Sequence, residues 1–376
     1  MLRHGLCSFC LLCLFLPVTG YVQTIQSASE CQVCHEILHS QWQSSRHALS
    51  SSAKNPFFAG LLEWANQTSQ GANCLRCHEP VRYLELEPEI VTSFVDEGVT
   101  CDLCHVSTLD NKAKWFVLQK GNVKYGPYGD AVSSVHKCRK SKLFQTSRIC
   151  LSCHGSTTSA SGMDFCSTES EWKQSSFAKS GVNCQDCHMP GVEGKAAPLG
   201  KIRDTIHSHV FYGGHTAEML NNCAEIQIGS RRFENGFQLD IGVSIRRIGH
   251  ALPTGSPMRM VYLLVEVMNE QGLILWRNME NSPFEDERAL FMRLLEDDRG
   301  NAPVPPWEAV SEKFDRRLMP DETRTLEYVI EDTTAYSVQA SLYYRLAPVS
   351  LLDKLGIQDS HYYERKLITS NTARLE

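Results

Sequence analysis

The sequence has no excess of basic residues and, after its first twenty positions, no long hydrophobic run. Its 37 Lys and Arg residues are outnumbered by 43 Asp and Glu residues, which gives a formal net charge of −6. A mildly acidic chain has no general electrostatic attraction to nucleic acid, so we expect no nucleic-acid partner. Without a further apolar stretch of about 20 residues, the rest of the chain is not expected to cross a membrane.

Residues 30–223 also lack the long periodic apolar runs from which a conventional hydrophobic core is built. This part of the chain is rich in Ser, Gly and Asn. The pattern predicts only short helices, over Glu36–Leu49, over Pro56–Gln67 and before Gly181. A segment of this kind can form a hydrophobic core only if another group contributes apolar surface to it.

What this segment contains is the phrase Cys-x-x-Cys-His, repeated five times. The copies, numbered here as motifs 1 to 5, are Cys31/Cys34/His35, Cys74/Cys77/His78, Cys101/Cys104/His105, Cys150/Cys153/His154 and Cys184/Cys187/His188. The phrase is the attachment signature of c-type haem. The two sulfurs bond to the vinyl groups of the porphyrin, and the adjacent histidine becomes an axial ligand of the iron. The sequence therefore predicts five covalently bound haems, whose porphyrins supply the missing apolar mass.

Zinc knuckles and redox-active dithiols also use paired cysteines at this spacing. Neither needs a histidine after every second cysteine, so haem attachment is the favoured interpretation. Of the 16 cysteines, three lie in the first twenty residues and ten belong to the motifs. In an oxidising compartment two of the remaining three are expected to pair, with Cys138 and Cys166 as the first choice and Cys223 left over.

Residues 1–20 are typical of a secretory signal peptide. Arg3 and His4 precede an apolar segment from Leu6 to Leu16, and small residues lead to a predicted cleavage after Gly20. An uncleaved membrane anchor is the alternative, but the apolar run is short for a bilayer. Export fits haem attachment, which occurs outside the cytoplasm in prokaryotes. The predicted location is periplasmic or extracellular.

The second axial position of each iron decides between electron transfer and chemistry at the metal. Histidines outside the motifs are the candidates for it. The predicted ligands are His47, His136, His207, His209 and His250, with His215 as a fallback. His207 and His209 alternate around Ser208, so an extended strand would direct them at different haems. His250 lies in a Gly/Pro-rich turn, Gly249–Gly255, from which it can reach back to a haem.

Three other residues are expected to have no role as ligands. His39 and His361 are predicted to be surface or loop histidines, and Met189 to pack against a porphyrin. Because histidine at both axial positions tends to hold potentials lower than His/Met ligation, mostly bis-histidine haems suit a low-potential respiratory chain.

From residue 225 onward the pattern changes to apolar residues at every second position. Strands are predicted over 237–245, 326–330 and 338–344, and a hairpin over 261–276 around Asn269–Gly272. Several short strands with turn signals favour an antiparallel β-sandwich of immunoglobulin-like type. The predicted fold class is α+β, with a signal peptide over 1–20, a pentahaem helix-and-loop domain over 21–224 and the β-sandwich over 225–376.

The residues Cys31–Ala48, with Trp42 and the phrase Ser45-x-His47-Ala48, resemble the opening of cytochrome c-554-like multihaem proteins. Gly181–Pro190 and the Gly249–Gly255 turn are similar to recurrent phrases of exported multihaem cytochromes. The resemblance implies anaerobic respiratory electron transfer outside the cytoplasmic membrane. It also implies redox partner proteins, such as a quinol-oxidising complex, other cytochromes or a terminal reductase, through which the chain would associate with a membrane.

An electron carrier, rather than an enzyme, is the expected function. One alternative is an oxidoreductase that reduces a small nitrogen or sulfur compound at a single haem without a sixth ligand. Another is a subunit of an extracellular cytochrome filament, in which a neighbouring copy supplies a missing histidine. The number of filled axial positions discriminates among the three.

Overall fold

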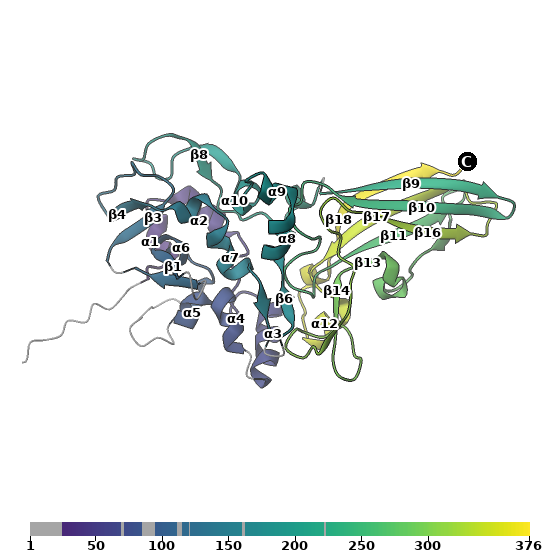
Figure 1. Cartoon of the computed structure of the whole chain (residues 1–376), viewed down its shortest axis with the longest axis horizontal. Helices are drawn as coiled ribbons and strands as arrows, with labels where there is room; N and C mark the ends of the chain where they lie inside the picture. Colours follow the sequence, from purple (N-terminus) through teal and green to yellow (C-terminus); the bar gives the residue numbers. More distant parts are fainter. Residues whose placement is uncertain are drawn as a thin grey trace, which may run out of the picture.

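The computed structural model describes residues 25–68, 71–84, 95–110, 115–119, 121–159, 162–221 and 223–376. The predicted signal peptide lies outside them. Helices and two-stranded sheets form one end of the molecule, and long antiparallel strands form the other (Figure 1). The α+β class predicted from the sequence is therefore confirmed. A search of the described residues finds no helix long and apolar enough to span a bilayer.

The first half is built from short helices. They are α1 (Ala28–Gln32), α2 (Glu36–Gln43), α3 (Pro56–Gln67), α4 (Gly71–His78), α5 (Pro80–Leu84), α6 (Cys101–His105), α7 (Arg148–His154), α8 (Thr168–Gln174), α9 (Ser176–Lys179), α10 (Cys184–His188) and α11 (Ala217–Leu220). Motifs 2 to 5 each occupy the last turn of a helix that ends at the motif histidine. One helical turn thus places two sulfurs and an imidazole on adjacent positions.

Helix α3 has the predicted bounds, whereas α2 ends six residues earlier than the predicted Leu49. The Ser45 hydroxyl accepts a hydrogen bond from the backbone N–H of Ala48. A serine that bonds the backbone locally competes with helical hydrogen bonding, which explains why the chain turns after Gln43.

Pairs of short strands hold the loops between the helices. They are β1 (Ser107–Asp110) with β2 (Trp115–Leu118), β3 (Val123–Gly126) with β4 (Lys137–Lys140), β5 (Thr157–Thr158) with β6 (Asp164–Cys166), and β7 (Gly191–Gly194) with β8 (Arg203–His207). All pairs are antiparallel except β3 and β4. Buried residues here form small separate clusters, such as Ala28 with Trp42 and Ala48.

The second half contains two larger sheets. One has the strand order β16 (Thr323–Ile330), β10 (Gly236–Ile245), β9 (Ala224–Phe233). The other has the order β12 (Ile274–Arg277), β11 (Met260–Met268), β17 (Ser337–Arg345), β18 (Lys366–Arg374), with β13 (Leu290–Phe291) also on β11. The remaining elements are β14 (Arg293–Glu296), β15 (Ser311–Asp315), α12 (Val349–Lys354) and the 3-10 helices η1 (Val95–Glu97), η2 (Lys142–Gln145), η3 (Pro283–Glu285), η4 (Glu287–Ala289) and η5 (Ser360–Tyr363).

The predicted strands and the predicted hairpin are present in this half. Val267 of β11 pairs with Trp276 of β12 across the hairpin. Alternate residues of β10, including Leu239 and Ile241, are fully buried in one core with Leu263 of β11. Both sheets therefore bury their apolar faces in a shared core. The immunoglobulin-like strand order and the division at residue 225 stay predictions.

A buried ion pair joins the two halves. Arg317 follows β15 in the chain, and its guanidinium group lies 2.6 Å from the carboxylate of Glu171 on α8. The Arg317 and Glu171 side chains are 9% and 4% exposed. Glu171 also accepts hydrogen bonds from the backbone N–H of Ala251 and from the Thr254 hydroxyl. One carboxylate thus fixes the turn that carries His250.

Candidate haem site

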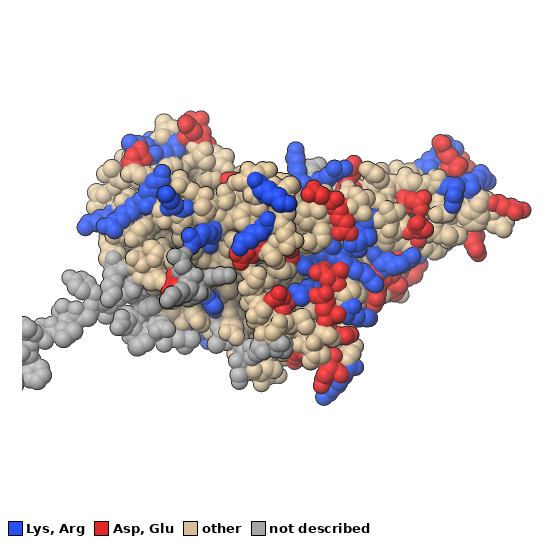
Figure 2. All heavy atoms as spheres, viewed as in Figure 1, with Lys and Arg blue, Asp and Glu red and all other residues tan. Residues whose placement is uncertain are grey.

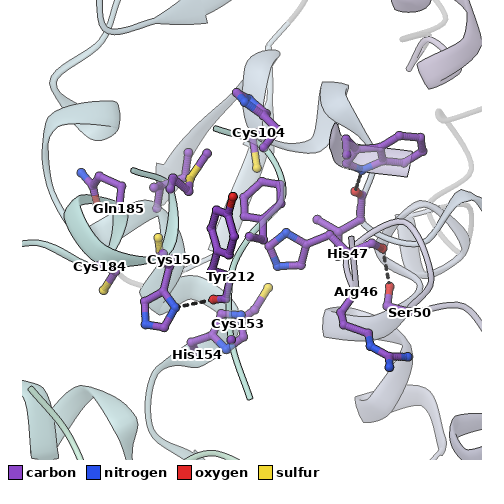
Figure 3. A pocket seen from close by; sticks show the side chains of 18 of the residues that line it. Arg46, His47, Ser50, Cys104, Cys150, Cys153, His154, Cys184, Gln185 and Tyr212 are labelled. Carbon is purple, nitrogen blue, oxygen red and sulfur yellow. Dashed lines mark hydrogen bonds between the residues drawn. The ribbon is translucent and has the colours of Figure 1, made fainter. Parts of the chain in front are cut away.

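A single cavity of about 2370 Å³ runs through the first half, and all ten motif cysteines and all five motif histidines line it. Figure 3 shows Cys104, Cys150, Cys153 and Cys184 around one stretch of it, with the His47 ring directed into the same space. Ordinary ligand pockets have volumes of about 300–1,000 Å³. A much larger cavity lined by thiols, imidazoles and apolar side chains fits several covalently bound haems.

A repeated local structure supports two of the motifs. Trp42 donates its indole N–H to the carbonyl of Val99, two residues before Cys101 of motif 3, and Trp172 donates in the same way to Val182, two residues before Cys184 of motif 5. In both segments the backbone just before the motif turns at a glycine of positive φ, which is 68° at Gly98 and 78° at Gly181. Residues 42–48 (WQSSRHA) and 172–178 (WKQSSFA) are also similar in sequence, so the two segments form a repeated packing unit.

Four motif histidines each face one other histidine. The distances between ring centres are 6.4 Å for His35 and His136, 6.2 Å for His47 and His154, 6.2 Å for His105 and His209, and 6.1 Å for His188 and His250. A metal–imidazole bond is about 2 Å long and the ring centre lies about 1 Å beyond the nitrogen, so two imidazoles on one ion have centres about 6 Å apart. Each pair therefore has the spacing that one haem iron requires.

Hydrogen bonds orient these rings for ligation. Nδ1 of His35, His105 and His188 lies 2.6–2.7 Å from the backbone carbonyls of Ala196, Tyr125 and Tyr212, and Nδ1 of His209 and His250 lies 2.9 Å from those of His207 and Ala251. A carbonyl oxygen only accepts, so Nδ1 carries the proton and Nε2 keeps its lone pair for a metal. The Nδ1 atom of His136 instead lies 3.6 Å from the Cys138 thiol.

Burial keeps several of these imidazoles neutral. It lowers the pKa of His47 to about 3, with further lowering from His154, and it lowers the pKa of His154 and His209 to about 4. Neutral imidazole is the form that binds metal. The rings are thus held in the ligating protonation state at neutral pH.

His78 of motif 2 differs from the other four. Its ring stacks on Phe58, with 4.3 Å between the ring centres and 13° between the planes, and no second histidine faces it among the described residues. Burial lowers the pKa of His78 to about 4, and the nearby Arg259 lowers it further. Arg259 donates from Nη1 to the Thr254 carbonyl, and its buried Nε has no partner in the described part of the chain. Motif 2 therefore combines one imidazole with a nearby cation.

The other predicted ligands have different surroundings. His207 hydrogen-bonds through Nδ1 to the Met189 carbonyl, and no motif histidine faces it in the described residues. His215 lines the cavity, where burial and the charge of Arg46 lower its pKa to about 4.

His39 is buried against Trp42, contrary to the expectation of a surface histidine, whereas His361 is partly exposed and pairs with Asp359.

The predicted disulfide between Cys138 and Cys166 is wrong. Both residues are free thiols, as is Cys223. Cys138 on β4 contacts His136, whereas Cys166 on β6 contacts the Thr168 hydroxyl. The two cysteines belong to separate sheets, each with a local polar partner.

Contacts between cysteines order the motifs in space. The Cys101 side chain of motif 3 is the main cause of a lowered pKa at Cys31 of motif 1, and Cys104 of motif 3 contributes to the raised pKa of Cys153 in motif 4 after Cys77 and burial. In the same way, the proximity of Cys77 of motif 2 raises the pKa of Cys153, and that of Cys184 of motif 5 raises the pKa of Cys150. Motif 4 is thus adjacent to motifs 2, 3 and 5, and motif 1 is at one end. No pattern in the sequence indicated this order.

Comparison with known proteins supports a haem-binding chain. Residues 30–106 match the family described as cytochrome c554 and c-prime. The structure is similar to the crystal structure of a penta-heme cytochrome c552 from Thermochromatium tepidum, with a TM-score of 0.75 and 26% sequence identity over 93% of this chain and 99% of that one. A search of curated proteins finds no match.

Proposed function

Since the chain is a multihaem c-type cytochrome of the cytochrome c-554-like superfamily, we propose that it carries electrons between redox partner proteins outside the cytoplasmic membrane through five haems. The observation that carries this proposal is the set of four facing histidine pairs, which would fill both axial positions at motifs 1, 3, 4 and 5. An iron with two imidazole ligands has no free position for a substrate and is suited to electron transfer.

The chain's own residues would bind, orient and tune the cofactors. Bound haem supplies a one-electron Fe(III)/Fe(II) couple. The motif cysteines would hold each porphyrin by thioether bonds, while carbonyl oxygens such as those of Ala196 and Tyr212 fix the imidazole planes. Histidine at both positions favours lower potentials than His/Met ligation.

The strand-rich half would serve as a rigid support. We assign it an immunoglobulin-like β-sandwich whose first long turn places His250 opposite His188. Glu171 supports the role of a rigid support, because this residue of the haem-binding half accepts a hydrogen bond from the backbone N–H of Ala251 in that turn. Among the four facing pairs of the described residues, His188 and His250 would then be the pair that joins one half of the chain to the other.

Electron transfer is tested by mixing the fully reduced protein with an oxidised monohaem cytochrome c under anaerobic conditions. We expect the α-band of every haem in the chain to bleach as the acceptor is reduced. A protein that reduces chemically but gives no electrons to any protein acceptor would contradict a carrier role.

A second function is favoured by one specific observation, the absence of a facing histidine at His78 in the described residues. The motif 2 iron would then keep a position open for a small molecule. Arg259, whose charge reaches His78, would stabilise a bound anion by charge-assisted hydrogen bonds from the guanidinium group. This arrangement is compatible with reduction of a small nitrogen or sulfur oxyanion at the motif 2 haem. Electrons would reach that haem through the haem of motif 4.

Titration with nitrite tests this second function. We expect a spectral change that corresponds to one haem, and weaker binding in Arg259→Met. A hydrogen bond to a charged group contributes about 1.5–3 kcal/mol, so the dissociation constant should rise by about tenfold or more. Arg231→Met, on β9 away from the cavity, is the matched control. No spectral change in the wild-type protein would exclude an open iron.

A further inference from the structure

Motif 1 lies at one end of the cysteine contacts and close to the molecular surface. Its histidine pair, His35 and His136, is enclosed by two loops whose apolar side chains are unusually exposed. Val132 and Val135 are 93% and 68% exposed, and Leu199 is fully exposed, although all three also line the haem cavity. A haem held at motif 1 would therefore have an edge within reach of a partner protein.

The surface beside this edge is basic, in contrast to the acidic chain as a whole. Residues 121–148 contain six Lys or Arg residues and a single Asp. In Figure 2, Lys and Arg predominate at the end of the molecule that holds β3, β4 and β8, whereas most visible Asp and Glu side chains lie over the other half. Basic side chains thus outnumber acidic ones in the segment beside motif 1, which is not true of the chain as a whole.

Most of this charge is not neutralised within the chain. Asp130 forms ion pairs with Lys201 and Arg203, and Lys124 pairs with Asp102. Four exposed cations on and after β4 have no carboxylate partner in the described residues. They are Lys137, Arg139, Lys140 and Lys142. A cluster of unpaired cations attracts an oppositely charged surface and raises the association rate at low salt.

We propose that Lys137, Arg139, Lys140 and Lys142, together with the exposed Val132, Val135 and Leu199, form a docking surface for an acidic electron-transfer protein, and that electrons enter or leave the chain at motif 1. The inference rests on the proposed carrier function. A small apolar centre within a charged rim is typical of transient redox complexes, which must dissociate after each transfer. The order of the motifs supports the same end, because motif 1 lies beyond motif 3 from the junction at motif 4.

Stopped-flow reduction by an acidic [2Fe–2S] ferredoxin tests the docking surface. The second-order rate constant should fall as ionic strength rises. A triple charge reversal, Lys137→Glu, Arg139→Glu and Lys140→Glu, should lower it by about tenfold or more at low salt. The matched control reverses the same number of exposed cations in the strand-rich half, by Arg231→Glu, Arg232→Glu and Arg299→Glu, and should leave the rate nearly unchanged.

Three outcomes would overturn the inference. Equal losses in both triple variants would mean a general charge effect. A rate independent of salt and of both sets of substitutions would place electron entry elsewhere. Binding of the wild-type protein, but not the β4 variant, to anionic phospholipid vesicles, with an unchanged ferredoxin rate, would assign the surface to a membrane. If dithionite reduces every variant but no protein donor reduces the wild type, the carrier function itself fails.

Discussion

Removal of motif 4 is expected to separate the remaining haems into groups that exchange electrons slowly. The double substitution Cys150→Ala and Cys153→Ala prevents covalent attachment at the position adjacent to motifs 2, 3 and 5. Motifs 1 and 3 would stay in contact through Cys31 and Cys101. With an acidic donor that docks at motif 1, only two of the four remaining haems should be reduced in the fast phase of a stopped-flow trace.

The matched control removes the haem of a motif that is adjacent to motif 4 and lies at an end of the motif order. Cys74→Ala with Cys77→Ala eliminates motif 2, which is adjacent to motif 4. All four remaining haems should then be reduced in one fast phase. Mass spectrometry verifies that each variant has lost a single haem. If the variant without motif 4 reduced all its haems as fast as this control does, motif 4 would not be the junction.

The second large effect is on stability. Glu171→Ala is expected to lower the free energy of unfolding by about 3–5 kcal/mol, because it leaves the buried Arg317 with an incompletely compensated charge. It also removes the acceptor for Ala251 and Thr254 in the turn that carries His250. Chemical denaturation followed by circular dichroism measures the change.

Glu225→Ala is the control for this substitution. Glu225 forms an ion pair with Arg246 in which both side chains are about half exposed, and such pairs contribute about 0–1 kcal/mol. An equally large loss of stability in the two variants would contradict the assigned role of the Glu171 pair.

The Glu171 pair also predicts a pH dependence. Burial opposes ionisation of Glu171, but the charge of Arg317 and hydrogen bonds from Ser167 and Thr254 outweigh it, so that the pKa lies below its ordinary value of 4.5. A lowered folded-state pKa contributes stability that is present above the unfolded-state value and is lost as pH falls through the folded-state value. Stability should therefore decrease below about pH 4.5 in the wild type, and less steeply in Glu171→Gln.

The sequence was most informative where chemistry or periodicity is local. The motif spacing predicted ten attachment cysteines, and all ten line one cavity, since one helical turn suffices to position two sulfurs and a histidine. The alternation of apolar residues around Leu239 and Leu263 predicted the strands, because one face of each sheet is buried. The end of α2 was placed too late because the local hydrogen bond between the Ser45 hydroxyl and the Ala48 N–H has no periodic signal.

The sequence could not indicate which histidines face each other. His47 follows motif 1 but faces His154 of motif 4, and His136 faces His35, about a hundred residues earlier in the chain. Such pairs depend on the tertiary arrangement of loops. His207 and His209 have similar sequence surroundings, yet only His209 faces a motif histidine among the described residues. Arg259 and the Glu171–Arg317 pair were missed because no local pattern marks them.

Low-temperature EPR of the fully oxidised protein, normalised to haem content by pyridine haemochrome, tests the central claim most directly. The facing pairs predict four low-spin ferric haems, and the unpaired His78 predicts one high-spin haem. The high-spin signal should disappear in Cys74→Ala/Cys77→Ala. Five low-spin haems in the dilute protein would show that another residue fills motif 2. Two or more high-spin haems would contradict the proposed histidine pairs.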